Sequence, residues 1–151
     1  MAIKSFRGLL ANNGIETILL KTNNGSTGYK IKKFEIMQNT PGAASTELVC
    51  KIYTIPQTAV DGVVDFSDNT LLAAATYEND AGVGTGPNTA IIFDNITFNQ
   101  DIYVTAIDIA SSQSTNYHIE LETVKLDLNE NTVATLKDIR NIKSQWVNNI
   151  I

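Results

Sequence analysis

The segment TNYHIELET, residues 115–123, alternates apolar and polar side chains along most of its length. Successive side chains of a β-strand point to opposite sides, so this period of two predicts a strand that buries one face. The buried face is predicted to hold Tyr117, Ile119 and Leu121. The outer face is then predicted to hold His118, Glu120 and Glu122. The segment is therefore interpreted as one half-buried strand of a β-sheet protein.

The outer-face triplet of this strand has two interpretations. Side chains two residues apart are separated by about 7 Å along a strand, so adjacent members of the triplet can share a divalent ion. A catalytic zinc commonly takes three protein ligands, often with two or more nitrogen or sulfur donors. His118 is the only histidine of the chain. We interpret the triplet as a solvated sheet face, and a metal or acid–base site is the alternative.

Seven further segments read as strands, because they are rich in apolar and β-branched residues and are bounded by Asn, Asp, Gly, Pro or Ser. They are Ile3–Ala11, Ile15–Thr22, Tyr29–Met37 and the segments 47–55, 70–77, 89–95 and 101–110. The segment 70–77, TLLAAATY, also fits a short helix. No helices alternate with the strands, so parallel neighbours are not expected. The predicted fold is an antiparallel, jelly-roll-like β-sandwich of about eight strands.

Two Asn-Gly pairs stand between the first three predicted strands, at Asn13-Gly14 and at Asn24-Gly25. Two-residue hairpin turns need positive φ values, which Asn and Gly adopt at low cost. The sequence therefore predicts that the first three strands form an antiparallel meander.

The third predicted strand contains a break in its alternation. Tyr29 and Ile31 share one parity, whereas Phe34 and Ile36 share the other. An extra residue near Lys32 and Lys33 restores a common inward face, so a β-bulge is predicted there.

The C-terminal part of the chain changes to a helical period. Apolar residues recur every three or four positions, at Val133, Leu136, Ile139, Ile142 and Trp146. This pattern predicts one helix over about 131–145, followed by an apolar tail, 146–151. The predicted partner-binding residues of the tail are Trp146, Val147, Ile150 and Ile151. Two alternatives stay open for them: folding back on their own sandwich, and docking on a neighbouring subunit.

Composition limits the function classes. The chain has 151 residues, 43% hydrophobic and 18% charged, which suits one globular domain with no membrane span. The net charge of -5 disfavours nucleic acid as a partner. The N-terminal residues lack the apolar core of a secretory signal, so folding in the cytoplasm is expected.

The remaining motifs do not form a recognisable catalytic pattern. DGVVDFSDN, from Asp61 to Asn69, departs from the calcium-binding EF-hand spacing, and its acidic residues are interpreted as turn formers. GVGTGP, 82–87, is interpreted as a surface loop because a strand, not a helix, is predicted to follow it. Cys50 lies in an apolar run and is interpreted as a buried thiol, with a reactive thiol as the alternative. We predict no catalytic residues, no cofactor and no metal.

Three segments resemble small virion structural proteins of tailed bacteriophages, particularly those of marine bacteria. They are IIFDNITFNQDIYVTAID (91–108), NYHIELETVKLDLNENTVATLKDIRNIKSQ (116–145) and GYKIKKFEIM (28–37) with the following PGA. The resemblance covers about two-thirds of the chain and assigns no site residues. It implies a component of the virion, assembled in the host bacterial cytoplasm and present in many copies or as a homo-oligomer.

Two functions follow as expectations from this resemblance. The first is a non-enzymatic capsid decoration or cement protein, whose partner is the major capsid protein. The alternative is a receptor- or glycan-binding module on a tail or fibre. Aromatic side chains exposed in loops favour the alternative, because sugars stack on rings. An enzyme that uses His118 and its flanking glutamates is a remote third hypothesis.

Overall fold

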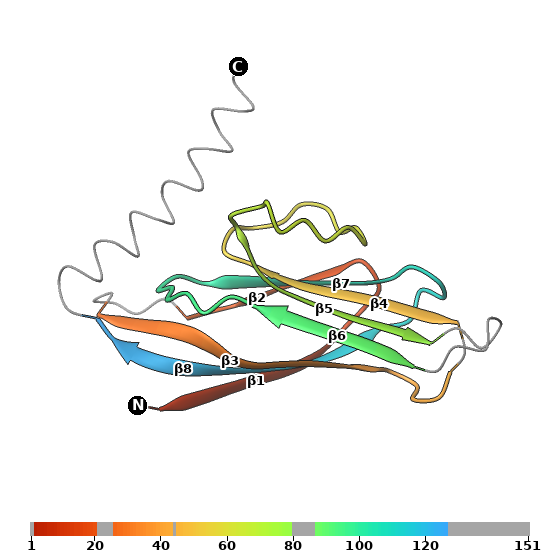
Figure 1. Ribbon diagram of the computed structural model, residues 1–151, viewed down its shortest axis with the longest axis horizontal. Helices are drawn as coiled ribbons and strands as arrows, with labels where there is room; N and C mark the ends of the chain where they lie inside the picture. The colour runs from red at the N-terminus through yellow and green to blue at the C-terminus, as the bar shows by residue number, and fades with distance from the viewer. Residues whose placement is uncertain (1, 21–25, 44, 80–86, 127–151) are drawn as a thin grey trace, which may run out of the picture.

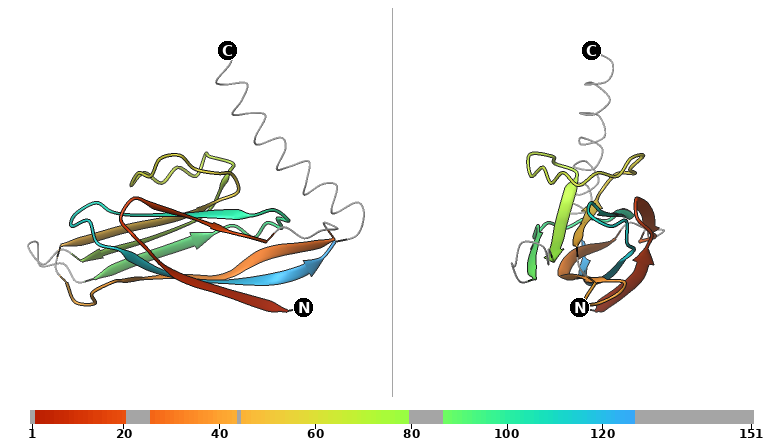
Figure 2. Two further views of the ribbon diagram at one scale, coloured as in Figure 1. Left: turned by 180° about the vertical axis from the view of Figure 1, so that it is seen from behind. Right: turned by 90° about the vertical axis from the view of Figure 1, so that its right-hand side faces the viewer.

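The computed structural model describes residues 2–20, 26–43, 45–79 and 87–126. It has two antiparallel sheets packed face to face, as Figures 1 and 2 show. The eight strands are β1 Ile3–Leu10, β2 Gly14–Ile18, β3 Thr27–Gln38, β4 Thr46–Tyr53, β5 Leu71–Asn79, β6 Asn88–Phe93, β7 Ile102–Asp108 and β8 Thr115–Lys125. The predicted all-β sandwich is confirmed, and residues 71–77 of the segment 70–77 lie in strand β5. The predicted helix 131–145 and tail 146–151 lie outside the described residues.

The order of the strands is that of a modified jelly roll. One sheet has the order β1-β8-β3 and the other has the order β2-β7-β4-β5-β6. A jelly roll is a long antiparallel hairpin, rolled up, that pairs strand 1 with 8, 2 with 7, 3 with 6 and 4 with 5. Three of those four pairs are present here. In place of the fourth, β6 pairs with β5, so β6 becomes the edge of the larger sheet.

The predicted meander of the first three strands is wrong. Strand β1 pairs with β8, β2 pairs with β7, and β3 pairs with β8. Asn13 does adopt a φ of 64°, and the Gly14 amide donates to the Ala11 carbonyl at 2.8 Å. This turn leads from one sheet into the other. The residues of a turn determine the conformation of about four residues of backbone. Which strand the following segment pairs with is determined by the packing of whole sheets. The second Asn-Gly pair lies outside the described residues.

The inner faces of the two sheets form the core, as the alternation predicted. Tyr117, Ile119 and Leu121 of β8 are buried. The ladder between β3 and β8 shifts register between Ile31 and Lys33, which confirms the predicted bulge. Because of this shift, side chains on both sides of the bulge enter the same core.

Cys50 belongs to this core and has no exposed surface. Burial raises the pKa of its thiol, because the thiolate has no solvent to stabilise it there. The interpretation as a buried thiol is confirmed.

A connecting segment, residues 54–70 between β4 and β5, crosses the outer face of the five-stranded sheet (Figures 1 and 2). We call it the covering segment. Three of its carboxylates accept hydrogen bonds from the amide two residues ahead: Asp61 from Val63, Asp65 from Ser67 and Asp68 from Thr70, at 2.9 to 3.0 Å. These bonds stabilise turns in the backbone, so the interpretation of this segment as turn-forming is confirmed.

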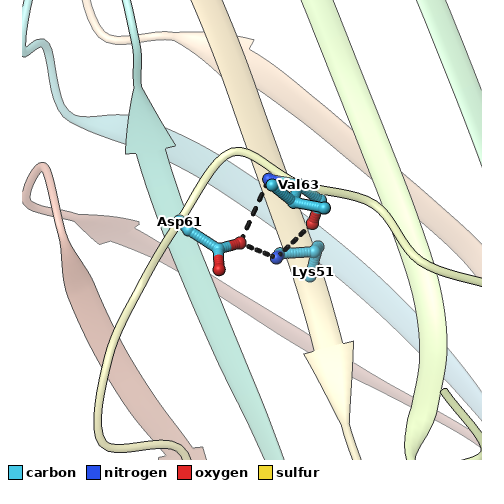
Figure 3. A network of polar contacts seen from close by, with 3 residues as sticks. All are labelled: Lys51, Asp61 and Val63. Atoms are coloured by element: carbon cyan, nitrogen blue, oxygen red, sulfur yellow. Dashed lines mark hydrogen bonds and ion pairs between the residues drawn. The ribbon is translucent and has the colours of Figure 1, made fainter.

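The covering segment is fastened to the sheet by Lys51 (Figure 3). This side chain is only 3% exposed, and its Nζ donates to Asp61 Oδ1 at 2.9 Å and to the Val63 carbonyl at 2.6 Å. Burial acts to lower the pKa of Lys51, but interactions with Tyr53 and Asp61 outweigh it and raise that pKa. The ammonium group therefore stays charged beneath the segment, held by two oxygens that the segment supplies.

Candidate partner-binding face

The outer face of the three-stranded sheet holds the triplet of β8, as predicted. His118, Glu120 and Glu122 are all partly exposed on this face. Each member has one cross-strand neighbour from β1 and one from β3. The rows are Arg7–His118–Glu35, Ser5–Glu120–Lys33 and Ile3–Glu122–Lys30. Basic side chains of the neighbouring strands therefore lie beside the carboxylates of β8.

Two ion pairs cross or border this face. Lys32 Nζ lies 3.2 Å from Glu122 Oε2, and Lys33 Nζ lies 3.6 Å from Glu35 Oε1. The lysines are exposed to solvent, so each pair is expected to contribute at most about 1 kcal/mol to folding. In the part of the chain that the structure describes, no group of three His, Cys, Asp or Glu side chains is placed to hold a metal ion.

A groove with a volume of about 540 Å³ lies at one end of this face. Its lining residues come from all three strands and are Arg7, Gly8, Leu9, Glu35, Ile36, Met37, Asn116, Tyr117 and His118. Leu9 and Met37 stand on either side of Asn116 and are 52% and 61% exposed. The next row holds Arg7, His118 and Glu35, so the groove is apolar at one end and charged at the other.

The floor of the groove is tied to the other sheet. The Tyr117 hydroxyl donates to Glu16 Oε2, on β2, at 2.6 Å. Burial, followed by the interaction with Glu16, raises the pKa of Tyr117, so the hydroxyl keeps its proton. Gly8 lies opposite Tyr117, and a Cβ atom at Gly8 would be only 2.9 Å from the tyrosine oxygen. A glycine is therefore needed there for the ring to pass beneath β1.

Charge is divided unequally between the two layers. The strands β1, β3 and β8 hold six basic and three acidic residues, a net charge of +3. The other described residues hold one basic residue, Lys51, and nine acidic residues, a net charge of -8. The three-stranded sheet is therefore a basic surface on an acidic protein.

The residues predicted to bind a partner, Trp146, Val147, Ile150 and Ile151, lie outside the described residues. Sequence reasoning missed Leu9, Met37 and Arg7, because their proximity depends on strand pairings that alternation alone does not specify. Within the described part of the chain, no helix is long and apolar enough to cross a membrane. No protein-family model matches this chain, and no curated protein matches it.

Proposed function

We propose that this protein is a non-enzymatic structural component of an assembled particle, which binds a protein lattice through the outer face of β1, β8 and β3. In its most specific form it is a capsid decoration or cement protein of a tailed phage, bound to the major capsid protein. The observation that carries the proposal is that no described segment covers this face, although Leu9 and Met37 are exposed on it. The resemblance in sequence supplies the kind of particle.

The chemistry of the face specifies the partner surface. Protein interfaces combine an apolar centre with a polar rim, and methionine and arginine are enriched in them. Leu9 and Met37 provide the apolar centre, and Arg7 provides the adjoining charge. The net charge of +3 on these strands favours an acidic partner surface, since opposite charges accelerate association and select the orientation. The acidic opposite layer would then point away from the lattice.

Occupancy on particles tests the proposal. The double variant Leu9→Asp and Met37→Asp should stay folded but lose binding to capsids that lack the native protein. The matched control is Val63→Asp, because Val63 is also exposed but lies in the covering segment of the opposite layer. Equal occupancy of the variant and the control would overturn the assignment of this face.

Stoichiometry in purified particles tests the location. Copies in the hundreds would indicate the capsid, and a few to a few dozen would indicate the tail. Absence of the protein from particles would overturn the virion role altogether.

The sequence-predicted tail requires a separate variant. Deleting Val147 to Ile151 should weaken binding to particles and leave the domain folded if these residues dock on a neighbour. A lower melting temperature with unchanged occupancy would mean that they pack on their own domain.

One observation favours the alternative, a glycan- or receptor-binding module. Phe66 is 61% exposed in the covering segment, and its neighbours in the sequence, Asp65 and Ser67, carry a carboxylate and a hydroxyl that bond to each other at 2.6 Å. An exposed ring offers an apolar surface on which a sugar can stack. Binding to a glycan panel that is abolished by Phe66→Ala, but not by Val63→Ala, would favour this alternative over the lattice role.

A further inference from the structure

We propose that the free edge of β6, Asn88–Phe93, pairs antiparallel with β6 of a second copy of this chain, joining two five-stranded sheets across a two-fold axis. Strand β6 ends the sheet β2-β7-β4-β5-β6, and the right-hand view of Figure 2 shows it at one border of the molecule. Five of its six residues are exposed. Strand β6 ends the five-stranded sheet because it pairs with β5 instead of β3.

The backbone groups available at this edge follow from the ladder with β5. The Asp94 amide donates to the Leu72 carbonyl at 2.9 Å, so Asp94 and Leu72 are a hydrogen-bonded pair. Such pairs alternate along an antiparallel ladder, so Asn88, Ala90 and Ile92 also bond to β5. The amides and carbonyls of Thr89, Ile91 and Phe93 consequently point away from β5, toward the free edge.

Strand β6 lacks the features that protect the other edges. Charged side chains, bulges and short length discourage edge strands from pairing with other chains. Strand β1 contains Lys4 and Arg7, and β3 contains three lysines and a bulge. Strand β2 has five residues, including Glu16. The sequence of β6 is NTAIIF, with no charge, no proline and no register shift.

The residues of β6 are complementary to themselves in one register. A two-fold axis at Ile91 places Thr89 opposite Phe93 of the second copy, so every free amide and carbonyl at the edge finds a partner. On the outer face of the sheet, Ile92 then lies opposite Ala90 of the second copy. Ile92 is 54% exposed in the single chain, and this pairing would cover part of its apolar surface.

Charge favours a second copy as the occupant of this edge. Two chains with a net charge of -5 repel each other where their acidic layers meet, but β6 provides a neutral strip along which they can approach. In the register centred on Ile91, Asp94 lies opposite Asn88 of the second copy. A carboxylate thus meets an amide that can donate to it, and no two like charges are placed opposite each other.

Sedimentation of the full chain over a range of concentrations tests the proposal. One strand pair gives an interface smaller than the standard size of about 1,600 Å², so we expect a weak dimer, populated at tens to hundreds of micromolar. Ile92→Lys should raise the dissociation constant at least tenfold. The matched control Val63→Lys exchanges a valine of the covering segment that is 65% exposed, and it should leave the constant unchanged.

A pair of proline variants distinguishes the free edge from the internal ladder. Thr89→Pro removes an amide that points to the free edge, so it should abolish the dimer with little change in melting temperature. Ala90→Pro removes an amide that bonds to β5, so it should lower the melting temperature of the monomer. If the Thr89→Pro variant does not fold, the dissociation constant of the Ile92→Lys variant decides whether the dimer forms through β6.

Disulfide formation tests the register. A mixture of Ala90→Cys and Ile92→Cys chains should form a mixed disulfide faster than either variant alone, because these positions are opposite each other and Cys50 is buried. A protein that stays monomeric up to about 1 mM would overturn the proposal. So would a dimer that survives both Ile92→Lys and Thr89→Pro, since the two copies would then meet elsewhere.

Discussion

The outer faces of the two sheets differ in what lies over them. On the five-stranded sheet, Val49, Lys51 and Ala74 are buried although they point away from the core. On the three-stranded sheet, Ile3, Leu9 and Met37 occupy the same kind of position and are exposed. The covering segment accounts for the difference, since it crosses only the first face. Strand geometry alone therefore does not decide which outer positions are buried.

The strands of the two sheets reflect this difference in their composition. Strand β4 is buried at seven of its eight positions, so it behaves like a strand with packed layers on both sides. Strand β8 alternates between buried and partly exposed positions over most of its length. The apolar residues on both sides of Lys51, from Leu48 to Cys50 and from Ile52 to Tyr53, were thus a signal that a further layer covers β4. Lys51 in the middle of the run obscures this signal.

The largest expected effect of a substitution on either outer face is at Lys51. Lys51→Ala removes the group that fastens the covering segment and leaves a cavity beneath it, so it should lower the free energy of unfolding by about 3 kcal/mol. Lys51→Met keeps most of the side-chain volume and should cost less. Urea denaturation measures both. A Lys51→Ala protein as stable as the parent would show that the segment stays in place without this contact.

A smaller loss of stability is expected from a substitution at Asp108, the last residue of β7. Its carboxylate accepts hydrogen bonds from the amides of Glu47, Ala110, Ser111 and Gln113, at 3.0 to 3.2 Å. Asp108→Ala should cost about 2 kcal/mol at pH 7, because it leaves these amides without their acceptor.

The free energy of unfolding that is lost in Asp108→Ala should depend on pH. Burial acts to raise the pKa of Asp108, but the four backbone donors outweigh it and lower that pKa. A lowered pKa in the folded state means that the stabilisation is present above the unfolded value, near pH 4, and is lost as the pH falls through the folded value. The difference between the parent and Asp108→Ala should shrink below about pH 4. A difference that stays constant down to pH 2 would contradict this assignment.

The smallest effects are expected on the uncovered face. His118→Ala and Met37→Ser should each change the free energy of unfolding by less than about 1 kcal/mol, because both side chains lie at partly or fully exposed positions. A loss of several kcal/mol in either variant would mean that the uncovered face is packed in solution against another segment or another copy. Thermal melting at two protein concentrations distinguishes these two cases, since only the second depends on concentration.

The features that sequence reasoning predicted correctly are local in origin. The inward positions of β8, the bulge after Ile31 and the turns at Asp61, Asp65 and Asp68 each depend on a few neighbouring residues. The incorrect prediction of a meander, by contrast, concerned which strands pair with each other. Asn13 and Gly14 form a tight turn, but nothing in a turn specifies whether the following strand joins the same sheet.

The sequence by itself determined where the strands lie and which of their side chains enter the core, because alternation acts along a single strand. Only the tertiary structure decided that Arg7, His118 and Glu35 share a row, that Lys51 lies beneath Asp61, and that β6 is an edge. The reason is physical: a backbone ladder accepts any strand with suitable hydrogen bonds. Which strands pair is therefore determined by the burial of whole sheet faces, and this burial depends on all the strands together.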